Sequence, residues 1–241
     1  MLSIIIPTIN EEKYLPLLLN SIKEQDFDDC EIIVADAGSK DKTVDIAKEY
    51  GCKIVKGGLV PAGRNRGAEA ATGGIFLFLD ADVILPPHFL KNAVESFEKN
   101  NLSIAGFRVL PSDGKFIDKI FFNLLNIFSI LTQKILPYSA CAILSKKSVH
   151  GAIGGFDEKI VFVEDYHYAK AASRVSKYKF FWNQPFYTSV RRFEKDGRFR
   201  VYFKYILAQL YMVFFGPVKS DIFKYKFDHY NENNDKNNLK I

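Results

Sequence analysis

The sequence contains few cysteines and none of the spacings that mark a disulfide or zinc framework. Its three cysteines, Cys30, Cys52 and Cys141, are odd in number and widely separated. Because no disulfide framework is implied, a reducing cytosol is the simplest compartment. The N-terminus lacks a basic region and Pro7 interrupts its short apolar run, so we expect no secretory signal peptide.

Other absences narrow the classes of function. No internal repeat or low-complexity linker divides the 241 residues before the C-terminal tail, and this length suits one α/β domain with additions. The first apolar run is not followed by G-x-G-x-x-G, which argues against a dinucleotide-binding oxidoreductase. A Gly-rich phosphate loop is missing at the same place, because Pro-Thr-Ile-Asn-Glu fills residues 7–11, and this disfavours a nucleotidyltransferase.

The N-terminal half alternates apolar runs with amphipathic segments. Runs at residues 4–6, 31–36 and 75–79 predict buried strands, with a shorter strand at 53–55. We expect Pro7 to stop the first strand. Strands that alternate with helices predict an α/β fold with a mainly parallel sheet flanked by helices.

Two helices are expected between the first three strands. Apolar residues in the first follow the i, i+3, i+4, i+7 spacing of one helix face, at Leu15, Leu18, Leu19 and Ile22. The second is expected to end at Gly51, and either Ser39 or Asp41 would cap its beginning.

The segment IFLFLDAD, residues 75–82, is the most informative part of the chain. An apolar run ends abruptly in two carboxylates, Asp80 and Asp82, with one small residue between them. Like charges this close repel each other, and a divalent cation that also binds phosphates would supply a reason for the pair. Two solvated aspartates at the end of a strand are the simpler alternative.

Three predicted strands end in acidic or turn residues, at 7–11, 36–39 and 80–82. Parallel strands bring their carboxyl ends to one edge of a sheet, where open α/β sheets bind ligands. The three segments therefore predict one site at that edge.

These segments together resemble a family 2 glycosyltransferase, which has the nucleotide-sugar-binding GT-A fold. The resemblance is carried, in the family's order, by IIIPTINEE at 4–12, VADAGSKDKT at 34–43, AGRNRG at 62–67, DAD at 80–82, GGFDE at 154–158 and ED at 164–165. It covers about two thirds of the chain, and beyond it only Arg191 and Arg192 offer a match.

The resemblance implies a nucleotide pocket. The residues that would line or hold the base, ribose and diphosphate are Pro7, Ile9, Glu11, Asp36, Arg64, Asp80, Arg191 and Arg192. Each has a structural alternative: Pro7 would only end a strand, Asn10 would only cap a helix, and Gly63 and Gly67 would serve turns.

The resemblance also implies a metal and a base. Asp82, with Asp80 in or near its shell, would bind Mg²⁺ or Mn²⁺ bridging the diphosphate, because the departing anion needs a Lewis acid. Asp165 would be the general base that takes the proton of the acceptor hydroxyl. Glu164 is adjacent, so either carboxylate would be able to face the acceptor. His150 and His167 receive no role.

Two departures from the family pattern matter. Ala37 stands where many members have a second acidic residue, which leaves Asp36 alone and the nucleobase preference open. The Gln-x-x-Arg-Trp signature of processive synthases is absent, since Gln184 is followed by Pro-Phe-Tyr. A non-processive enzyme is therefore expected.

The second half has two apolar segments and a basic cluster. Residues 120–131 are apolar except for a polar residue at every third position, and 201–218 carry only Lys204 as a formal charge. The first segment is too short to span a bilayer, and would lie in a membrane interface or pack across the sheet. The second is borderline for a span, but Lys204, Gln209 and Gly216-Pro217 favour an interfacial helix. Residues 191–204 hold six basic residues against two acidic ones, which suits an anionic membrane surface or a diphosphate.

We therefore expect a catalytic domain at 1–190, with a nucleotide-binding half at about 1–110 and an acceptor half at about 111–190. An interfacial helix at 191–227 and a disordered tail at 228–241 would follow. The implied activity is inverting, non-processive transfer from a nucleoside diphosphate sugar to a hydroxyl or a polyprenyl-linked acceptor. It would occur at the cytoplasmic membrane face, without nucleic acid. A soluble glycosyltransferase and a catalytically silent sugar-nucleotide-binding domain are the alternatives. Sugar, base, acceptor and oligomeric state stay open.

Overall fold

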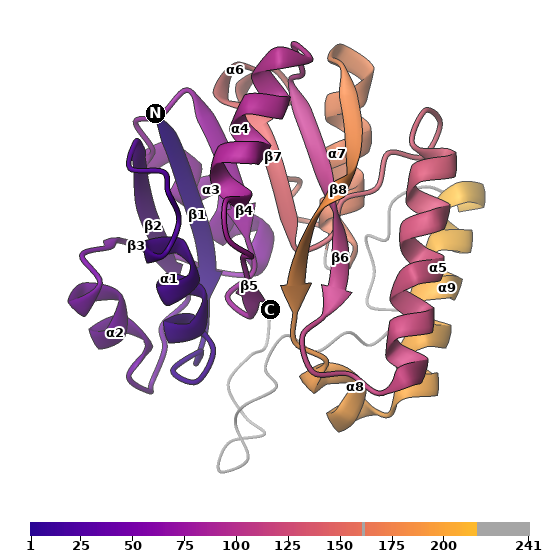
Figure 1. The fold of residues 1–241 in the computed structure, drawn as a ribbon, viewed down its shortest axis with the longest axis horizontal. Helices are drawn as coiled ribbons and strands as arrows, with labels where there is room; N and C mark the ends of the chain where they lie inside the picture. Colours follow the sequence, from indigo (N-terminus) through magenta and orange to yellow (C-terminus); the bar gives the residue numbers. More distant parts are fainter. Residues whose placement is uncertain (161, 216–241) are drawn as a thin grey trace.

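The structure, a computed structural model, describes residues 1–160 and 162–215. Its centre is an eight-stranded sheet with the order β3-β2-β1-β4-β7-β6-β8-β5 (Figure 1). The strands are β1 (Leu2–Thr8), β2 (Cys30–Asp36), β3 (Lys53–Lys56), β4 (Ile75–Leu79), β5 (Val83–Ile84), β6 (Ile104–Pro111), β7 (Ala142–Lys146) and β8 (Tyr178–Thr188). The predictions for residues 216–227 and for the tail at 228–241 lie outside the described residues.

The prediction of a mainly parallel sheet is confirmed. β3, β2, β1 and β4 are mutually parallel, and β6 and β8 are parallel to each other. β7 runs antiparallel to both β4 and β6, and the short β5 runs antiparallel to β8. Six strands therefore point their carboxyl ends to the same edge.

Helices cover both faces of the sheet, because successive side chains of each strand point to opposite sides. One face packs against α1 (Leu15–Lys23), α2 (Thr43–Glu49), α4 (Phe89–Lys99) and α5 (Phe116–Thr132), with α8 (Arg191–Asp196) and α9 (Arg198–Phe215) beside them. The other packs against α3 (Val60–Ala70), α6 (Lys147–Ala152) and α7 (Glu164–Val175). The predicted face of the first helix is correct, since Leu15, Leu18, Leu19 and Ile22 are all buried.

The expectation that Pro7 stops the first strand is wrong. β1 continues to Thr8, and Pro7 pairs in register with Ala35 of β2. The Thr8 carbonyl accepts from Ala37 N–H on the β2 side, so the neighbouring Pro7 directs its backbone towards β4. Pairing with β4 has already ended at Ile5, and the missing N–H of Pro7 therefore interrupts no ladder.

Gly63 and Gly67 lie within helix α3 and serve no turn. A Cβ on Gly67 would come within 2.4 Å of Ile5 Cγ2, and a Cβ on Gly63 within 3.1 Å of Pro7 Cβ. The two glycines let α3 approach β1 closely. This approach places Arg64, between them, beneath the carboxyl edge of the sheet.

The predicted end of the second helix is correct, but its N-cap residue is Lys42, without a side-chain cap hydrogen bond, and neither Ser39 nor Asp41 holds that position. Asp41 Oδ1 accepts a hydrogen bond from Thr43 N–H, at the first residue of α2, while Ser39 Oγ is used elsewhere. Gly51 follows the helix with φ of +72°, as a C-terminal glycine should. Among the described residues, none of the helices combines the length and the apolarity needed to cross a bilayer.

Candidate active site

The loops after β1 and β2 are tied together at the carboxyl edge of the sheet. Asn10 N–H donates to Ser39 Oγ at 2.9 Å, and Lys40 N–H donates back to Asn10 Oδ1 at 2.8 Å. Glu11 N–H donates to Thr43 Oγ1 at 2.7 Å. Asn10 has φ of +53°, which an asparagine tolerates better than most residues, and it bridges two loops instead of capping a helix. The predicted convergence of the first two segments is therefore confirmed.

Asp36 ends β2 and organises the turn that follows it. Its Oδ2 accepts from Gly38 N–H and Ser39 N–H, both at 2.9 Å, and its Oδ1 accepts from the hydroxyls of Ser39 and Thr8. A carboxylate has about four acceptor sites, so all of them are used. A nucleobase N–H would have to replace one donor, and the longest bond, from Thr8 at 3.3 Å, is the one to yield.

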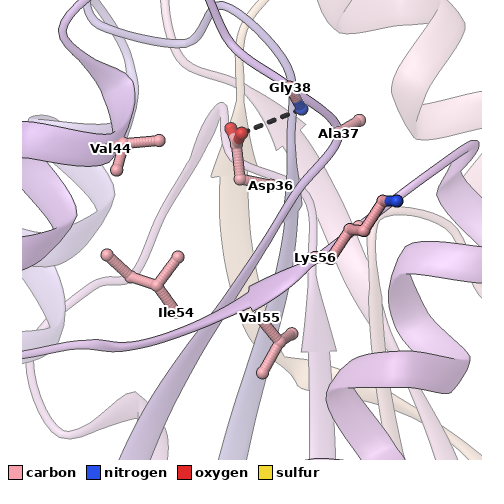
Figure 2. A pocket seen from close by; sticks show the side chains of 8 residues that line it. Asp36, Ala37, Gly38, Val44, Ile54, Val55 and Lys56 are labelled. Carbon is pink, nitrogen blue, oxygen red and sulfur yellow. Dashed lines mark hydrogen bonds between the residues drawn. The ribbon is translucent and has the colours of Figure 1, made fainter.

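A cavity of about 360 Å³ opens beside Asp36. Figure 2 shows its walls: Asp36 and Ala37 from the end of β2, Val44 from α2, and Ile54, Val55 and Lys56 from β3. Ala37 lies in this wall, so the departure from the family pattern falls on the cavity itself. Apolar walls with one acidic group and one basic group suit a planar heterocycle with polar edges.

Arg64 of α3 links Asp80, the residue after β4, to Glu164, the first residue of α7. Its Nη2 lies 2.7 Å from Asp80 Oδ1 and its Nη1 lies 3.0 Å from Glu164 Oε1, with the guanidinium also over the Phe156 ring. The side chain is only 1% exposed, so these two carboxylates neutralise a fully buried cation. Arg64 therefore holds Asp80 and Glu164 in place. Asp165, the residue after Glu164, lies outside these two ion pairs and is available to the site.

Arg191 at the start of α8 makes a matching bridge above the edge. Its Nη1 and Nη2 donate to both carboxylate oxygens of Glu11, at 2.6 and 2.7 Å, and its Nε lies 3.0 Å from Asp82 Oδ2. The guanidinium stacks on the Tyr14 ring, with 4.3 Å to the centroid. Residues 11, 82 and 191 are thus brought together as predicted, and Tyr14 was missed because a tyrosine outside the motifs gave no signal.

The remaining predicted residues lie around the same edge. Pro7 is buried under α3, Ile9 is half-buried just after β1, and Arg192 lies with Nη1 3.4 Å from Tyr205 Oη of α9. Asp165 is in the first turn of α7, where Tyr166 N–H donates to its Oδ1 at 2.7 Å.

Burial raises the pKa of several of these carboxyls. It raises the pKa of Glu11 to about 7, although the Arg191 guanidinium opposes the shift. Burial and the neighbouring Glu164 raise the pKa of Asp165 to about 8. Burial also raises the pKa of Asp82, with Arg191 opposing and Asp80 adding to it. A carboxyl group with a raised pKa is harder to ionise, and a nearby positive charge stabilises its ionised form.

The residues present fit a divalent cation completed by phosphate. Among the described residues no group of three or more His, Cys, Asp or Glu side chains forms a metal site. Mg²⁺, however, is usually held by one or two carboxylates together with waters and substrate phosphates, and Asp80 and Asp82 are such a pair. The Arg191 guanidinium on Asp82 shows that a positive charge is already favoured there.

The fold is that of GT-A-type glycosyltransferases. The mannosyltransferase PcManGT from Pyrobaculum calidifontis, solved with GDP-Man and Mn²⁺, superposes with a TM-score of 0.70 at 22% identity, over 88% of this chain and 63% of that one. Residues 1–349 of S. aureus TarS, solved with UDP-GlcNAc, superpose with a TM-score of 0.67 at 22% identity, over 87% and 66%.

Residues 3–156 match glycosyl transferase family 2, and the chain belongs to this family. The poly(ribitol-phosphate) β-N-acetylglucosaminyltransferase TarS of Staphylococcus aureus (strain Mu50) is 27% identical over 180 residues. The 4,4'-diaponeurosporenoate glycosyltransferase of Staphylococcus haemolyticus is 29% identical over 225 residues. The matches cover 68% and 83% of this chain but only 30% and 56% of those relatives.

Proposed function

We propose that this chain is a non-processive glycosyltransferase that uses a nucleoside diphosphate sugar and a divalent cation. The observation that carries the proposal is the pair of Asp80 and Asp82 after β4, at the carboxyl edge of the sheet on which the cavity beside Asp36 also lies. The solved neighbours hold UDP-GlcNAc, or GDP-Man with Mn²⁺, which supports the same donor class here.

Different residues would contact the base, the ribose and the diphosphate of the donor. The base would enter the cavity beside Asp36, with Pro7, Ile9 and Glu11 bordering the ribose. Mg²⁺ or Mn²⁺, held by Asp82 and near Asp80, would stabilise the negative charge that develops on the leaving diphosphate. Arg191 and Arg192 would contact the same diphosphate, and Arg64 would keep Asp80 in place.

Asp165 would act as the general base. Its carboxylate would accept the proton of the acceptor hydroxyl while the oxygen attacks the anomeric carbon and the bond to the diphosphate breaks. Attack from the face opposite the leaving group in one displacement inverts that carbon. Glu164 is held by Arg64 at 3.0 Å, which favours Asp165 as the carboxylate that meets the acceptor.

The acceptor would be a hydroxyl compound or a polyprenyl-linked acceptor at the cytoplasmic face of the cell membrane. One relative is named as a 4,4'-diaponeurosporenoate glycosyltransferase. The exposed apolar side chains of α5 and α9 favour a membrane location over a soluble enzyme with both helices in its core.

Binding of UDP, GDP, ADP and their sugars, with Mn²⁺, Mg²⁺ or EDTA, tests the proposal. We expect one nucleotide to bind only with metal, and Asp82→Asn to weaken that binding at least about tenfold. Asp45→Asn is the matched control, because Asp45 is an exposed carboxylate on α2. Metal-dependent binding that Asp82→Asn leaves unchanged would refute the metal assignment. Binding of donor without hydrolysis or transfer would favour a silent domain.

A further inference from the structure

Helix α5 exposes an apolar stripe along its whole length. Phe116, Leu124 and Leu131 are 78%, 60% and 77% exposed, although α5 is packed on the sheet by its opposite side. The stripe also includes Ile117, Ile120, Ile127 and Phe128, and Ile135 continues it just past the helix. Monomeric soluble proteins rarely leave so many large apolar side chains in water on one face.

Helix α9 repeats the pattern. Its inward residues Val201, Tyr202 and Ala208 are buried, whereas large apolar residues at helical spacing on the outward side are exposed. These outward residues are Phe199, Phe203, Ile206, Leu207 and Leu210.

The two helices are fixed side by side and run in the same direction. Arg198 Nε of α9 lies 3.0 Å from Asp118 Oδ2 of α5, and the rings of Phe121 and Tyr202 stack with 4.0 Å between their centroids. The Asp118 side chain is fully buried, so this is a buried ion pair and not an exposed surface pair. Figure 1 shows both helices at one edge of the molecule. We name the exposed residues listed above the α5–α9 face.

The exposed formal charges on α5, on α9 and in the turn after α5 are of one sign, whereas Glu194 of the neighbouring α8, which is 56% exposed, pairs with Arg198 at 2.8 Å. Within residues 115–135 and 198–211 the one acidic residue is Asp118, which is buried against Arg198. The exposed charged residues are Lys115, Lys119, Lys134 and Arg200. Long basic side chains around an apolar stripe place their charges at lipid head groups while the stripe enters the acyl boundary. A second copy docked through this face by two-fold symmetry would set the same positive charges against each other.

We propose that the α5–α9 face docks on a bilayer that contains anionic lipids, with both helices lying in the plane of the membrane surface. This inference deepens the proposed function, on which it rests for the acceptor. It assigns the membrane contact to one preformed surface of two helices, where the sequence offered the segments at 120–131 and from residue 191 onwards as separate interfacial helices.

The same arrangement places the chemistry close to the lipid. The inner side of α9, through Tyr205 and Ala208, packs against Phe162 and Tyr166, and Tyr166 adjoins Asp165. One helix, about 10–12 Å across, therefore separates the docked surface from the residues around the general base. A hydroxyl that projects from a membrane-held acceptor would reach Asp165 around the edge of that helix.

Flotation of the full chain with vesicles tests the docking. The vesicles are phosphatidylcholine alone or with about one third phosphatidylglycerol. We expect wild-type protein to float with the anionic vesicles, and a Leu124→Glu/Phe203→Glu variant to lose partitioning at least about tenfold. The matched control is Leu17→Glu/Val175→Glu, because those side chains are 48% and 60% exposed on α1 and at the end of α7. This control should float like wild type.

Other results overturn the inference. Wild-type protein that does not float, or a control variant that loses flotation equally, contradicts a specific docking face. A wild-type dimer in analytical ultracentrifugation that the Leu124→Glu/Phe203→Glu variant dissociates, without flotation, assigns the face to a second copy. Metal-dependent nucleotide binding by the wild-type protein and by the same variant is measured in parallel. Wild-type protein that floats but binds no nucleotide supports the docking and contradicts the proposed function. Wild-type protein that binds nucleotide but does not float supports the proposed function and contradicts the docking.

Discussion

At the scale of single residues, the site is built from two arginines that each bridge two carboxylates. Arg64 spans Asp80 and Glu164, and Arg191 spans Glu11 and Asp82. Carboxylates withdrawn from water need a compensating positive charge, and each arginine supplies it with planar, multiple hydrogen bonds. The two differ in freedom, because Arg64 is fully buried while Arg191 is 19% exposed at the mouth of the site. Arg191 therefore contacts the Asp82 carboxylate, which the proposed metal cation would also bind.

Removing Arg191 should strengthen metal binding in the absence of nucleotide. In Arg191→Ala the Asp82 carboxylate loses its competing cation, and we expect the affinity for Mn²⁺ to rise about threefold to tenfold. The affinity for nucleoside diphosphate with Mn²⁺ should fall, because the same guanidinium would contact the diphosphate. Titration of free Mn²⁺ by electron paramagnetic resonance at about pH 8 measures the first effect; at this pH, proton competition is reduced.

Arg174→Ala, at an exposed arginine of α7, is the control for loss of one positive charge. Equal or weaker Mn²⁺ binding by Arg191→Ala would show that Arg191 supports the metal site and does not compete with it.

Asp165 should impose an acid limb, a loss of activity towards low pH, on the pH profile of transfer. Its pKa is about 8 because of burial and the adjacent Glu164, so at lower pH the carboxyl is protonated and cannot accept the hydroxyl proton. We expect kcat/KM to rise with pH through about this value. Asp165→Asn should lower kcat by about 10²–10⁴ and abolish the limb. Glu164→Gln is the informative partner: if it loses the limb while Asp165→Asn keeps it, Glu164 is the base.

At the scale of elements, sequence patterns predicted the strands of the N-terminal half and the meeting of their loops. Buried apolar runs were sufficient for the strands, and the rule that parallel strands share one carboxyl edge was sufficient for the meeting of their loops. The prediction that Pro7 ends the first strand was wrong, because the missing N–H of a proline interrupts a strand only where a neighbouring strand would have accepted its hydrogen bond. The Arg64–Glu164 ion pair was not predictable, because it joins residues 100 positions apart through the close packing of α3 against β1.

Close packing of α3 predicts a specific sensitivity at Gly67. Gly67→Ala would place a Cβ 2.4 Å from Ile5 Cγ2, and Ile5 is a buried β-branched residue with little freedom to move. We expect the free energy of unfolding to fall by about 1–3 kcal/mol. Gly151→Ala in α6, where no atom lies within 4 Å, should change it by less than about 0.5 kcal/mol or raise it. Urea denaturation compares the two, and equal effects would show that α3 adjusts freely.

At the scale of the whole molecule, one sheet joins the earlier and later parts of the described chain. β5, from the first half, pairs with the end of β8, and Ser189 N–H donates to the Asp82 carbonyl at 3.2 Å. This pairing delivers Arg191 to Glu11 and Asp82, so residues 180 positions apart complete one site. The acidic edge is thereby enclosed, and this enclosure is what raises the pKa values of its carboxyls.

The stability of the metal-free chain should therefore fall as pH rises from about 6.5 to about 8.5. Glu11 and Asp165 have folded pKa values of about 7 and about 8, whereas unfolded carboxyls titrate near 4. In this window the folded state binds more protons than the unfolded state, so raising the pH favours unfolding. We expect the free energy of unfolding to fall by at least about 1 kcal/mol across this window. Urea denaturation measures it, with the fluorescence of Trp182, the one tryptophan of the chain, as the probe. Asp165→Asn should flatten the decline, and Mn²⁺ should stabilise most at the upper end, where the carboxylates are ionised. A free energy of unfolding that is level or rising across this window would mean that these carboxyls are already ionised in the folded protein.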